Sequence, residues 1–220
     1  IEAKGEFLDQ LRDMANRVPF DDRGNENISI DDISPLLLKD YLTKIDSRLA
    51  KANFATDIET ILDQMQLYDG PKEKRIIKNV AAMMFSEHPE KFFPTTQVDI
   101  VVFPKGREVD PENFIEVPPI KGPVPMMIRN SLEYLRTNII KERITKPTDD
   151  ERSLKVFNYP FQALEEAVVN ALYHRDYKER EPVEITIEPD RISILSYSGP
   201  DRSISLESLK EANMLRSRRY

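Results

Sequence analysis

Apolar and polar residues alternate regularly through residues 182–199, PVEITIEPDRISILSYSG. The apolar positions are Val183, Ile185 and Ile187, followed by Ile192 and Ile194. Because successive side chains of a strand point to opposite faces, the two runs predict a β-hairpin with one buried face, turning at Pro189-Asp190. A sheet with one buried face needs helices packed against it, so we expect an α+β fold.

The rest of the chain supplies the helices and the remaining strands. Apolar residues recur at helical spacing in residues 1–19, 34–50, 56–69, 74–94 and 122–144, and a further helix is expected to begin at Pro160. Runs rich in β-branched residues predict a buried strand in 97–104, an extended edge in 113–120 and a short strand in 154–160. Polar loops are expected at 21–27 and 145–153. The sequence thus predicts a helical N-terminal segment followed by a mixed sheet covered by helices.

Composition restricts the class of protein. The chain is 40% apolar and 32% charged, which is typical of a globular protein with a charged surface. No apolar run approaches the roughly 18 to 20 residues of a membrane span, and the first residues contain no apolar signal core. The absence of cysteine excludes disulfides, thiolate metal sites and thiol catalysis. We expect a cytoplasmic protein without a membrane partner, and, since residue 1 is not Met, a piece of a longer one.

The distribution of charge argues against a polyanion binder. The formal net charge is −7, which disfavours a general affinity for nucleic acid. The exception is LRSRRY at the end of the chain, where Arg216, Arg218 and Arg219 cluster. These arginines are either a solvated tail or a contact to phosphate or DNA, because neighbouring guanidiniums can neutralise backbone charge.

Several nucleotide and metal chemistries are excluded by missing residues. The six glycines are too far apart for a P-loop or a dinucleotide fingerprint. The HRD triplet at 174–176 also occurs in protein kinases, but their catalytic loop needs an Asn five residues after the Asp, and this position is Glu181. His88 and His174, the two histidines, are distant in sequence and have no cysteine to complete a zinc site.

The helix that begins at Pro160 carries the most specific pattern. At about 100° per residue, Phe161, Leu164, Val168 and Leu172 share one face. Glu166, Asn170 and Tyr173 lie almost opposite, with His174 beside them. An amphipathic helix with one solvated face explains this arrangement without any function.

Two details favour a binding site on that solvated face. Asn is a poor helix former in mid-helix, because its amide competes for backbone hydrogen bonds. Asn170 also follows Glu166 by one turn, so an amide oxygen and a carboxylate share a small volume. Such a pair suits a Mg²⁺ ion with phosphates attached, or a carboxylate that activates water.

Three segments resemble one bacterial and archaeal protein family: MMFSEHPEKFFPTTQVDIVVF, YPFQALEEAVVNALYHRDY and PVEITIEPDRISILSYSGP. Members are named as transcriptional regulators or RecG-like ATP-dependent DNA helicases. They combine an AlbA_2/Schlafen-type DNA-binding domain, a divergent GHKL-like ATPase domain and a winged helix. The resemblance covers nearly all of the chain, from VPFDD onward. It implies that residues 1–70 are a helical region after the DNA-binding domain, and that 71–220 are the GHKL (Bergerat)-like domain, incomplete at its C-terminal end.

The resemblance also implies roles for single residues. In the GHKL ATPases, a helix with Glu-x-x-x-Asn, the N-box, precedes strands and a glycine turn. By this likeness Glu166 is the catalytic carboxylate that polarises water, and Asn170 binds Mg²⁺ and nucleotide. The other residues expected at the nucleotide site are His174, Arg175, Asp176 and Gly199. ATP and Mg²⁺ are the implied cofactors.

One position departs from the active pattern. Active GHKL ATPases place an Asp two residues before the first glycine, where it accepts a hydrogen bond from the adenine amino group. Tyr197 occupies this position, and a phenol supplies no carboxylate. The chain also contains no glycine-rich lid, so we expect little or no ATP hydrolysis.

The leading prediction is an ATP-binding-like central region of a DNA-binding transcriptional regulator, which relays ligand state or dimerisation to flanking DNA-binding domains. One alternative is an active Mg²⁺-dependent ATPase coupled to DNA remodelling, although no P-loop motor is present. Another is a purely structural homodimerisation module, in which the Glu166 and Asn170 face packs on a second subunit.

Overall fold

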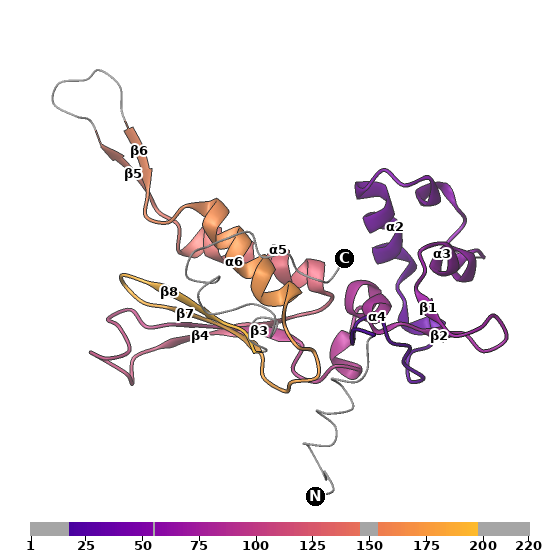
Figure 1. Cartoon of the computed structure of the whole chain (residues 1–220). Coiled ribbons are helices and arrows are strands. Elements are labelled where there is room, and N and C mark those ends of the chain that lie inside the picture. Colours follow the sequence, from indigo (N-terminus) through magenta and orange to yellow (C-terminus); the bar gives the residue numbers. More distant parts are fainter. Residues whose placement is uncertain (1–17, 55, 146–153, 198–220) are drawn as a thin grey trace, which may run out of the picture. The chain divides into compact units, whose positions relative to one another are not determined.

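A computed structural model describes residues 18–197 except 55 and 146–153 (Figure 1). Within this range the chain forms two compact units, residues 18–87 and 88–197. Gly199, the three C-terminal arginines, most of the helix expected at 1–19 and all of the loop expected at 145–153 except Thr145 lie outside the described residues. No helix in the described ranges combines the length and the apolar character that a membrane span requires.

The first unit is built from short helices and a small sheet. Its elements are η1 (Ile30–Asp32), α2 (Pro35–Lys44), η2 (Arg48–Lys51), α3 (Ile58–Gln64), β1 (Tyr68–Asp69), β2 (Ile76–Ile77) and α4 (Asn79–Phe85). Ser34 precedes α2 in an extended conformation and Pro35 occupies its first turn, where a missing N–H costs no hydrogen bond. Leu38 and Leu42 of α2 and Ile61 and Leu62 of α3 are buried in the core.

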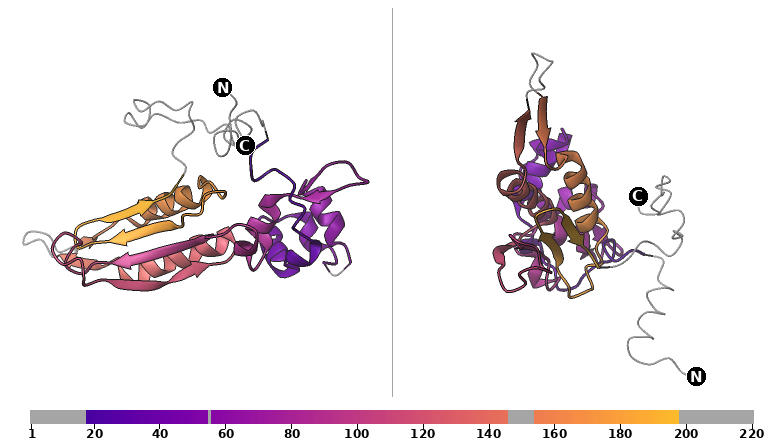
Figure 2. Two further views of the ribbon diagram at one scale, coloured as in Figure 1. Left: turned by 90° about the horizontal axis from the view of Figure 1, so that it is seen from below. Right: turned by 90° about the vertical axis from the view of Figure 1, so that its left-hand side faces the viewer.

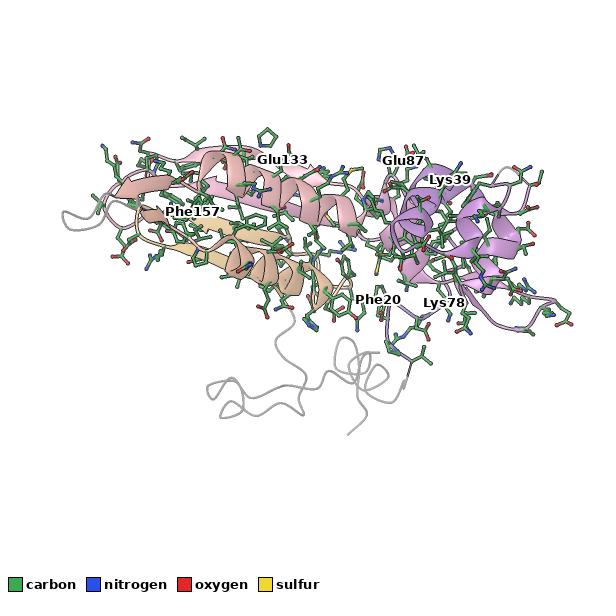
Figure 3. All side chains as sticks on the ribbon, turned by 90° about the horizontal axis from the view of Figure 1, so that it is seen from above. Phe20, Lys39, Lys78, Glu87, Glu133 and Phe157 are labelled. Atoms are coloured by element: carbon green, nitrogen blue, oxygen red, sulfur yellow. The ribbon has the colours of Figure 1, made fainter. Side chains whose placement is uncertain are left out.

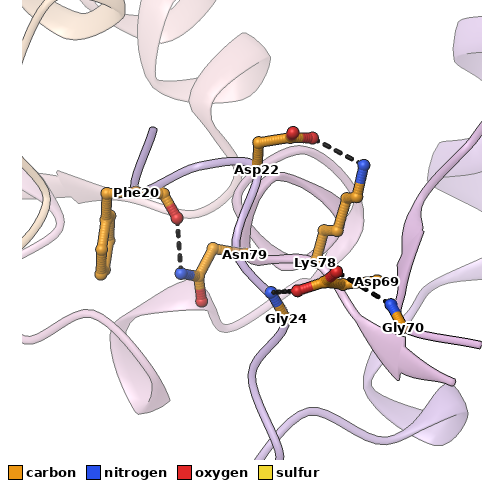
Figure 4. A network of polar contacts seen from close by, with 7 residues as sticks. All are labelled: Phe20, Asp22, Gly24, Asp69, Gly70, Lys78 and Asn79. Carbon is orange, nitrogen blue, oxygen red and sulfur yellow. Dashed lines mark hydrogen bonds and ion pairs between the residues drawn. The ribbon is translucent and has the colours of Figure 1, made fainter. Parts of the chain in front are cut away.

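Polar contacts connect the beginning of this unit to its end (Figure 4). Asn79 is buried and donates from Nδ2 to the carbonyl of Phe20 at 2.8 Å. Asp69 accepts the backbone N–H groups of Gly24 and Gly70, at 3.0 and 2.8 Å. Gly70 has a φ of 85°, a conformation that favours glycine, and it begins the turn from β1 to β2. These bonds fix residues 20–25 against the segment that leads into α4.

The helix expected at 74–94 is wrong in its first residues. Ile76 and Ile77 form β2 and pair antiparallel with Asp69 and Tyr68, because β-branched residues suit a strand. The helix α4 begins at Asn79 and ends at Phe85, and the separate turn η3 (Pro89–Lys91) follows. Pro89 supplies no N–H to continue α4.

The sequence also predicts a boundary between residues 70 and 71, whereas the two units divide between Glu87 and His88. Long-range hydrogen bonds hold the intervening residues in the first unit. The Ser34 amide, for example, donates to the Phe85 carbonyl at 2.8 Å.

The second unit contains a four-stranded mixed sheet in the order β4-β3-β7-β8. Its strands are β3 (Gln97–Val102), β4 (Ile115–Lys121), β7 (Val183–Ile187) and β8 (Ile192–Leu195). The central pair β3 and β7 is parallel, and the outer pairs are antiparallel. The predicted hairpin is therefore confirmed as β7–β8, and the α+β class is confirmed with it.

The edge strand β4 contains two consecutive prolines. Pro118 and Pro119 cannot donate to a ladder, and the pairing of β3 with β4 shifts register between Val98 and Ile100, opposite them. Proline is tolerated in a sheet at such an edge. The sequence prediction of an extended edge at 113–120 agrees with this position.

Helices α5 (Val124–Asn138) and α6 (Phe161–Tyr173) cover one face of the sheet (Figures 1 and 2). α5 packs on β3 and β4, α6 packs on β8, and the helices pack on each other. The core between the layers includes Ile100, Leu135, Val168 and Ile185, all at most 1% exposed. Figure 3 looks onto the helix layer, with Glu133 labelled on α5.

A two-stranded ribbon separates the two helices in sequence. The helix expected at 122–144 ends at Asn138, and its last predicted residues form β5 (Glu142–Thr145), which pairs antiparallel with β6 (Leu154–Phe157). Asn158 closes the base of the ribbon by accepting the Lys141 amide at 2.7 Å and donating to the Ile139 carbonyl at 2.9 Å. The strand at β5 was missed because its pairing partner, β6, is separated from it in sequence by residues 146–153.

Candidate functional site

The two faces of α6 are those that its periodicity predicts. Leu164, Val168 and Leu172 are buried against the sheet and α5. Glu166, Asn170 and Tyr173 are exposed on the outer side of the helix. The hydrophobic pattern therefore assigns the orientation of the predicted N-box pair correctly.

The Glu166 carboxylate and the Asn170 amide lie one helical turn apart, as neighbours on the surface of α6. Among the described residues, neither side chain has a hydrogen-bond partner. Across the same ranges, no group of three or more His, Asp or Glu side chains is placed to hold a metal ion. The pair could supply two oxygen ligands to Mg²⁺, and phosphates or water would have to supply the others.

Three of the last four carbonyls of α6 accept hydrogen bonds. The carbonyl of Asn170 accepts the His174 amide at 3.0 Å. The Ala171 carbonyl accepts the Ser196 hydroxyl at 2.8 Å, and the Leu172 carbonyl accepts the Tyr177 hydroxyl at 2.8 Å. Carbonyls at a helix end otherwise lack an intrahelical partner. These bonds join the end of α6 both to the turn that follows it and to the end of β8.

The turn after α6 lies against the end of the hairpin. The backbone amide of Asp176 donates to the Tyr197 carbonyl at 3.2 Å. The Asp176 carboxylate accepts the Lys178 amide at 3.0 Å, which closes a local turn. The fold therefore brings half-buried Asp176 and exposed His174 to the strand end that leads toward Gly199.

Arg175 is placed differently from its neighbours, because its side chain is only 2% exposed. Its Nη2 donates to the carbonyls of Glu181 and Glu179, at 2.7 and 3.3 Å. Burial lowers the pKa of the guanidinium, and the nearby Tyr177 and Asp176 oppose this shift. The side chain therefore points into the protein, and this position does not match the nucleotide contact that the family resemblance implies.

Tyr177 and Ser196 contribute to this site without having been found in the sequence. Tyr177 is buried, packs edge-on against Phe93, and has its pKa raised by burial. Ser196 reaches α6 across a separation of 25 residues. The helical period gives no signal for Tyr177, since five residues after Leu172 an extended helix would have turned by about 140°, away from the buried face.

A hollow of about 350 Å³ lies elsewhere, on the strands β3, β4 and β7. Its lining includes Gln97, Asp99, Val101, Glu184 and Thr186, which alternate with the core residues of β3 and β7. Alternate residues of a strand face opposite sides, so this hollow is on the sheet face away from α5 and α6. It does not include the predicted site on α6.

Comparison with known proteins gives a likeness of fold. No protein-family model matches the chain, and no curated protein matches it. Among solved structures, the chain is similar to the DIP2311 protein of Corynebacterium diphtheriae, with a TM-score of 0.59 and 19% identity. The match covers 91% of this chain but 38% of DIP2311, so the chain spans well under half the length of that protein. At this level of identity the likeness concerns the fold alone.

Proposed function

We propose that residues 88–197 belong to a divergent GHKL-type nucleotide-binding module within a DNA-associated transcriptional regulator of bacterial or archaeal type. The module binds ATP or ADP with Mg²⁺ and relays the bound state, or its dimerisation, to flanking DNA-binding domains. It hydrolyses ATP slowly or not at all. The DNA partner and cytoplasmic location belong to the same proposal.

One observation carries this proposal. Glu166 and Asn170 occupy adjacent turns on the exposed side of α6, and the end of the same helix is hydrogen-bonded to the end of β8 through Ser196. The Glu-x-x-x-Asn pair and the strand that leads to the glycine turn therefore belong to one connected structure. That is the order of parts in a GHKL nucleotide site.

The weak hydrolysis follows from Tyr197 and from the isolation of Glu166. A tyrosine in place of the adenine-contacting Asp supplies a hydroxyl instead of a carboxylate, so adenine is bound less specifically. Glu166 is exposed and has no hydrogen-bond partner among the described residues, so no described side chain orients it toward an attacking water. Binding can therefore persist where turnover does not.

The test is nucleotide binding by calorimetry and thermal shift on the wild type and on Asn170→Ala. We expect Mg²⁺-ATP or Mg²⁺-ADP to raise the melting temperature of the wild type. Loss of the amide ligand should weaken the affinity by about tenfold or more, which corresponds to about 1.4 kcal/mol. Gln162→Ala, at an exposed position one turn before Glu166 on the same helix, is the matched control and should bind as the wild type does.

The alternative functions give different results in the same samples. Phosphate release that needs Mg²⁺ and disappears in Glu166→Ala would identify an active ATPase. Absence of any nucleotide effect, together with loss of a dimer in Asn170→Ala measured by light scattering, would identify a dimerisation module instead. No nucleotide effect and no change in assembly would reject both the nucleotide proposal and the dimer interface.

A further inference from the structure

We propose that Arg175 is a positioning residue. Its buried side chain orders the turn 174–182, so that His174 and Asp176 are held beside the end of β8. Arg175 itself does not contact the nucleotide. This inference rests on the proposed nucleotide site for its function, while the positioning can be tested without nucleotide.

The contacts of the guanidinium join three parts of the second unit. Arg175 is the second residue after the end of α6. Its Nη2 donates to the carbonyls of Glu179 and Glu181, which lie just before β7. The same nitrogen lies 3.5 Å from the Thr95 hydroxyl, directly before β3. Since β3 and β7 are neighbouring parallel strands, one side chain meets the beginnings of both central strands and the end of α6.

The Tyr177 ring completes the surroundings of this cation. The guanidinium carbon lies 5.1 Å from the ring centroid, within the range of a cation–π interaction. Tyr177 in turn donates its hydroxyl to the Leu172 carbonyl and packs on Phe93. The two alternate residues of the turn, Arg175 and Tyr177, therefore point inward together, while His174 is exposed and Asp176 is half-buried.

Simple filling of space does not account for an arginine here. Among the described residues, its buried Nε and Nη1 donate no hydrogen bond, and no carboxylate forms an ion pair with it. A buried charge without a counter-ion is costly, and an apolar side chain of similar volume is often as stabilising or more so. What an apolar residue cannot supply is the set of directed bonds to two carbonyls of the following turn, which a planar guanidinium provides.

The consequence for the site is one of geometry. The bonds from Arg175 to the Glu179 and Glu181 carbonyls fix the conformation of the turn. Asp176 is then held where its amide donates to the Tyr197 carbonyl. Without Arg175, the turn keeps the carboxylate-to-Lys178 amide bond of Asp176 but loses its attachment to the start of β7. The element HRD thus contains one inward anchor between exposed His174 and half-buried Asp176.

The experiment compares Arg175→Met, Arg175→Lys and the control Arg180→Met, which changes an exposed arginine of the same turn. Amide hydrogen exchange is followed at Asp176, Lys178 and Glu179, whose N–H groups make the bonds of the turn, at a temperature where every variant is folded. We expect exchange at these amides to accelerate by about tenfold or more in Arg175→Met, while amides of β7 stay protected. Arg175→Lys should recover part of the protection, since an ammonium can still donate to one carbonyl.

Mg²⁺-ATP affinity is measured on the same variants. Weaker affinity in step with faster local exchange supports positioning. Weaker affinity with wild-type exchange in the turn would overturn it in favour of direct nucleotide contact. Unchanged exchange together with unchanged affinity in Arg175→Met, or a uniform increase in exchange over the whole unit, would show that Arg175 only fills space in the core. If the wild type binds no nucleotide, the proposed function fails, and the exchange data still decide whether Arg175 orders the turn.

Discussion

The outer face of α6 and the turn that follows it are adjacent in sequence but opposite in character. On the outer face, Glu166 and Asn170 are exposed and have no hydrogen-bond partner among the described residues. In the turn, Arg175 and Tyr177 are buried and bonded to carbonyls of the helix end and the next loop. One short segment therefore contains exposed side chains without protein partners and buried side chains that hold the scaffold.

The energetic cost of a polar side chain differs between these two regions. An exposed polar side chain is solvated by water, so leaving it without a protein partner costs little. A buried one must be bonded inside the protein, because an unpaired buried polar group is expensive. Substitutions in the two regions should accordingly affect different properties, ligand affinity in the first and stability in the second.

The largest effect should come from Tyr177, and Tyr173, four residues earlier, is its control. Tyr177→Ala removes a buried ring and leaves the Leu172 carbonyl without its donor, so we expect the free energy of unfolding to fall by about 3–5 kcal/mol. Tyr173→Ala, at 54% exposure, should change it by no more than about 0.5 kcal/mol. Urea denaturation of both variants checks the pair, and equal losses would contradict the contrast between face and turn.

An intermediate effect is expected at alkaline pH. Burial raises the pKa of the Tyr177 phenol above that of the unfolded chain, which is about 10. The unfolded chain therefore releases this proton first, so the stability linked to Tyr177 is fully present below about pH 10 and is lost as the pH rises further. One such group contributes a slope of about 1.4 kcal/mol per pH unit.

Tyr177→Phe should remove this dependence of the unfolding free energy on pH. It also removes the hydrogen bond from the Tyr177 hydroxyl to the Leu172 carbonyl. Tyr134, which is half-buried and whose pKa burial also raises, provides the control Tyr134→Phe, with a smaller change expected. Unfolding measured between pH 8 and about 11.5 on the three proteins makes the comparison. The same alkaline slope in Tyr177→Phe and the wild type would show that other groups set it.

The smallest effect has the opposite sign. In the absence of nucleotide, Asn170→Ala should raise the free energy of unfolding by about 0.5 kcal/mol. Ala is the better helix former, and the exposed Asn170 amide makes no hydrogen bond to a described residue that the substitution would remove. Thermal unfolding of the free protein measures it. A loss of more than about 1 kcal/mol would reveal a native partner for this amide and would sharpen the case for a packed interface on this face.

Much of the helix layer and the sheet could be predicted because their signals are local. The apolar stripe of Leu164, Val168 and Leu172 repeats at helical spacing, and the run from Val183 to Ile187 repeats at strand spacing. Each repeat is set by backbone geometry, so it indicates which side is buried before any partner is known. Where a partner decides the outcome, as for β2 and β5, the helical prediction was wrong.

The candidate site divides along the same line. Exposure of Glu166 and Asn170 follows from the periodicity of α6, whereas the inward direction of Arg175 does not, since the helix has already ended and no period applies. Arginine by itself favours the surface. Its burial here is compensated by the carbonyls of Glu179 and Glu181, the Thr95 hydroxyl and the ring of Tyr177.

The residue pattern alone determined the α+β class, the β7–β8 hairpin and the outward face of α6, because hydrophobic periodicity acts within a few residues. The tertiary structure decided the place of the unit boundary, the strand pairing of β2 and β5, and the joining of α6 to β8 through Ser196. These depend on hydrogen bonds between residues far apart in sequence, and such bonds exist only once the chain has brought their partners together.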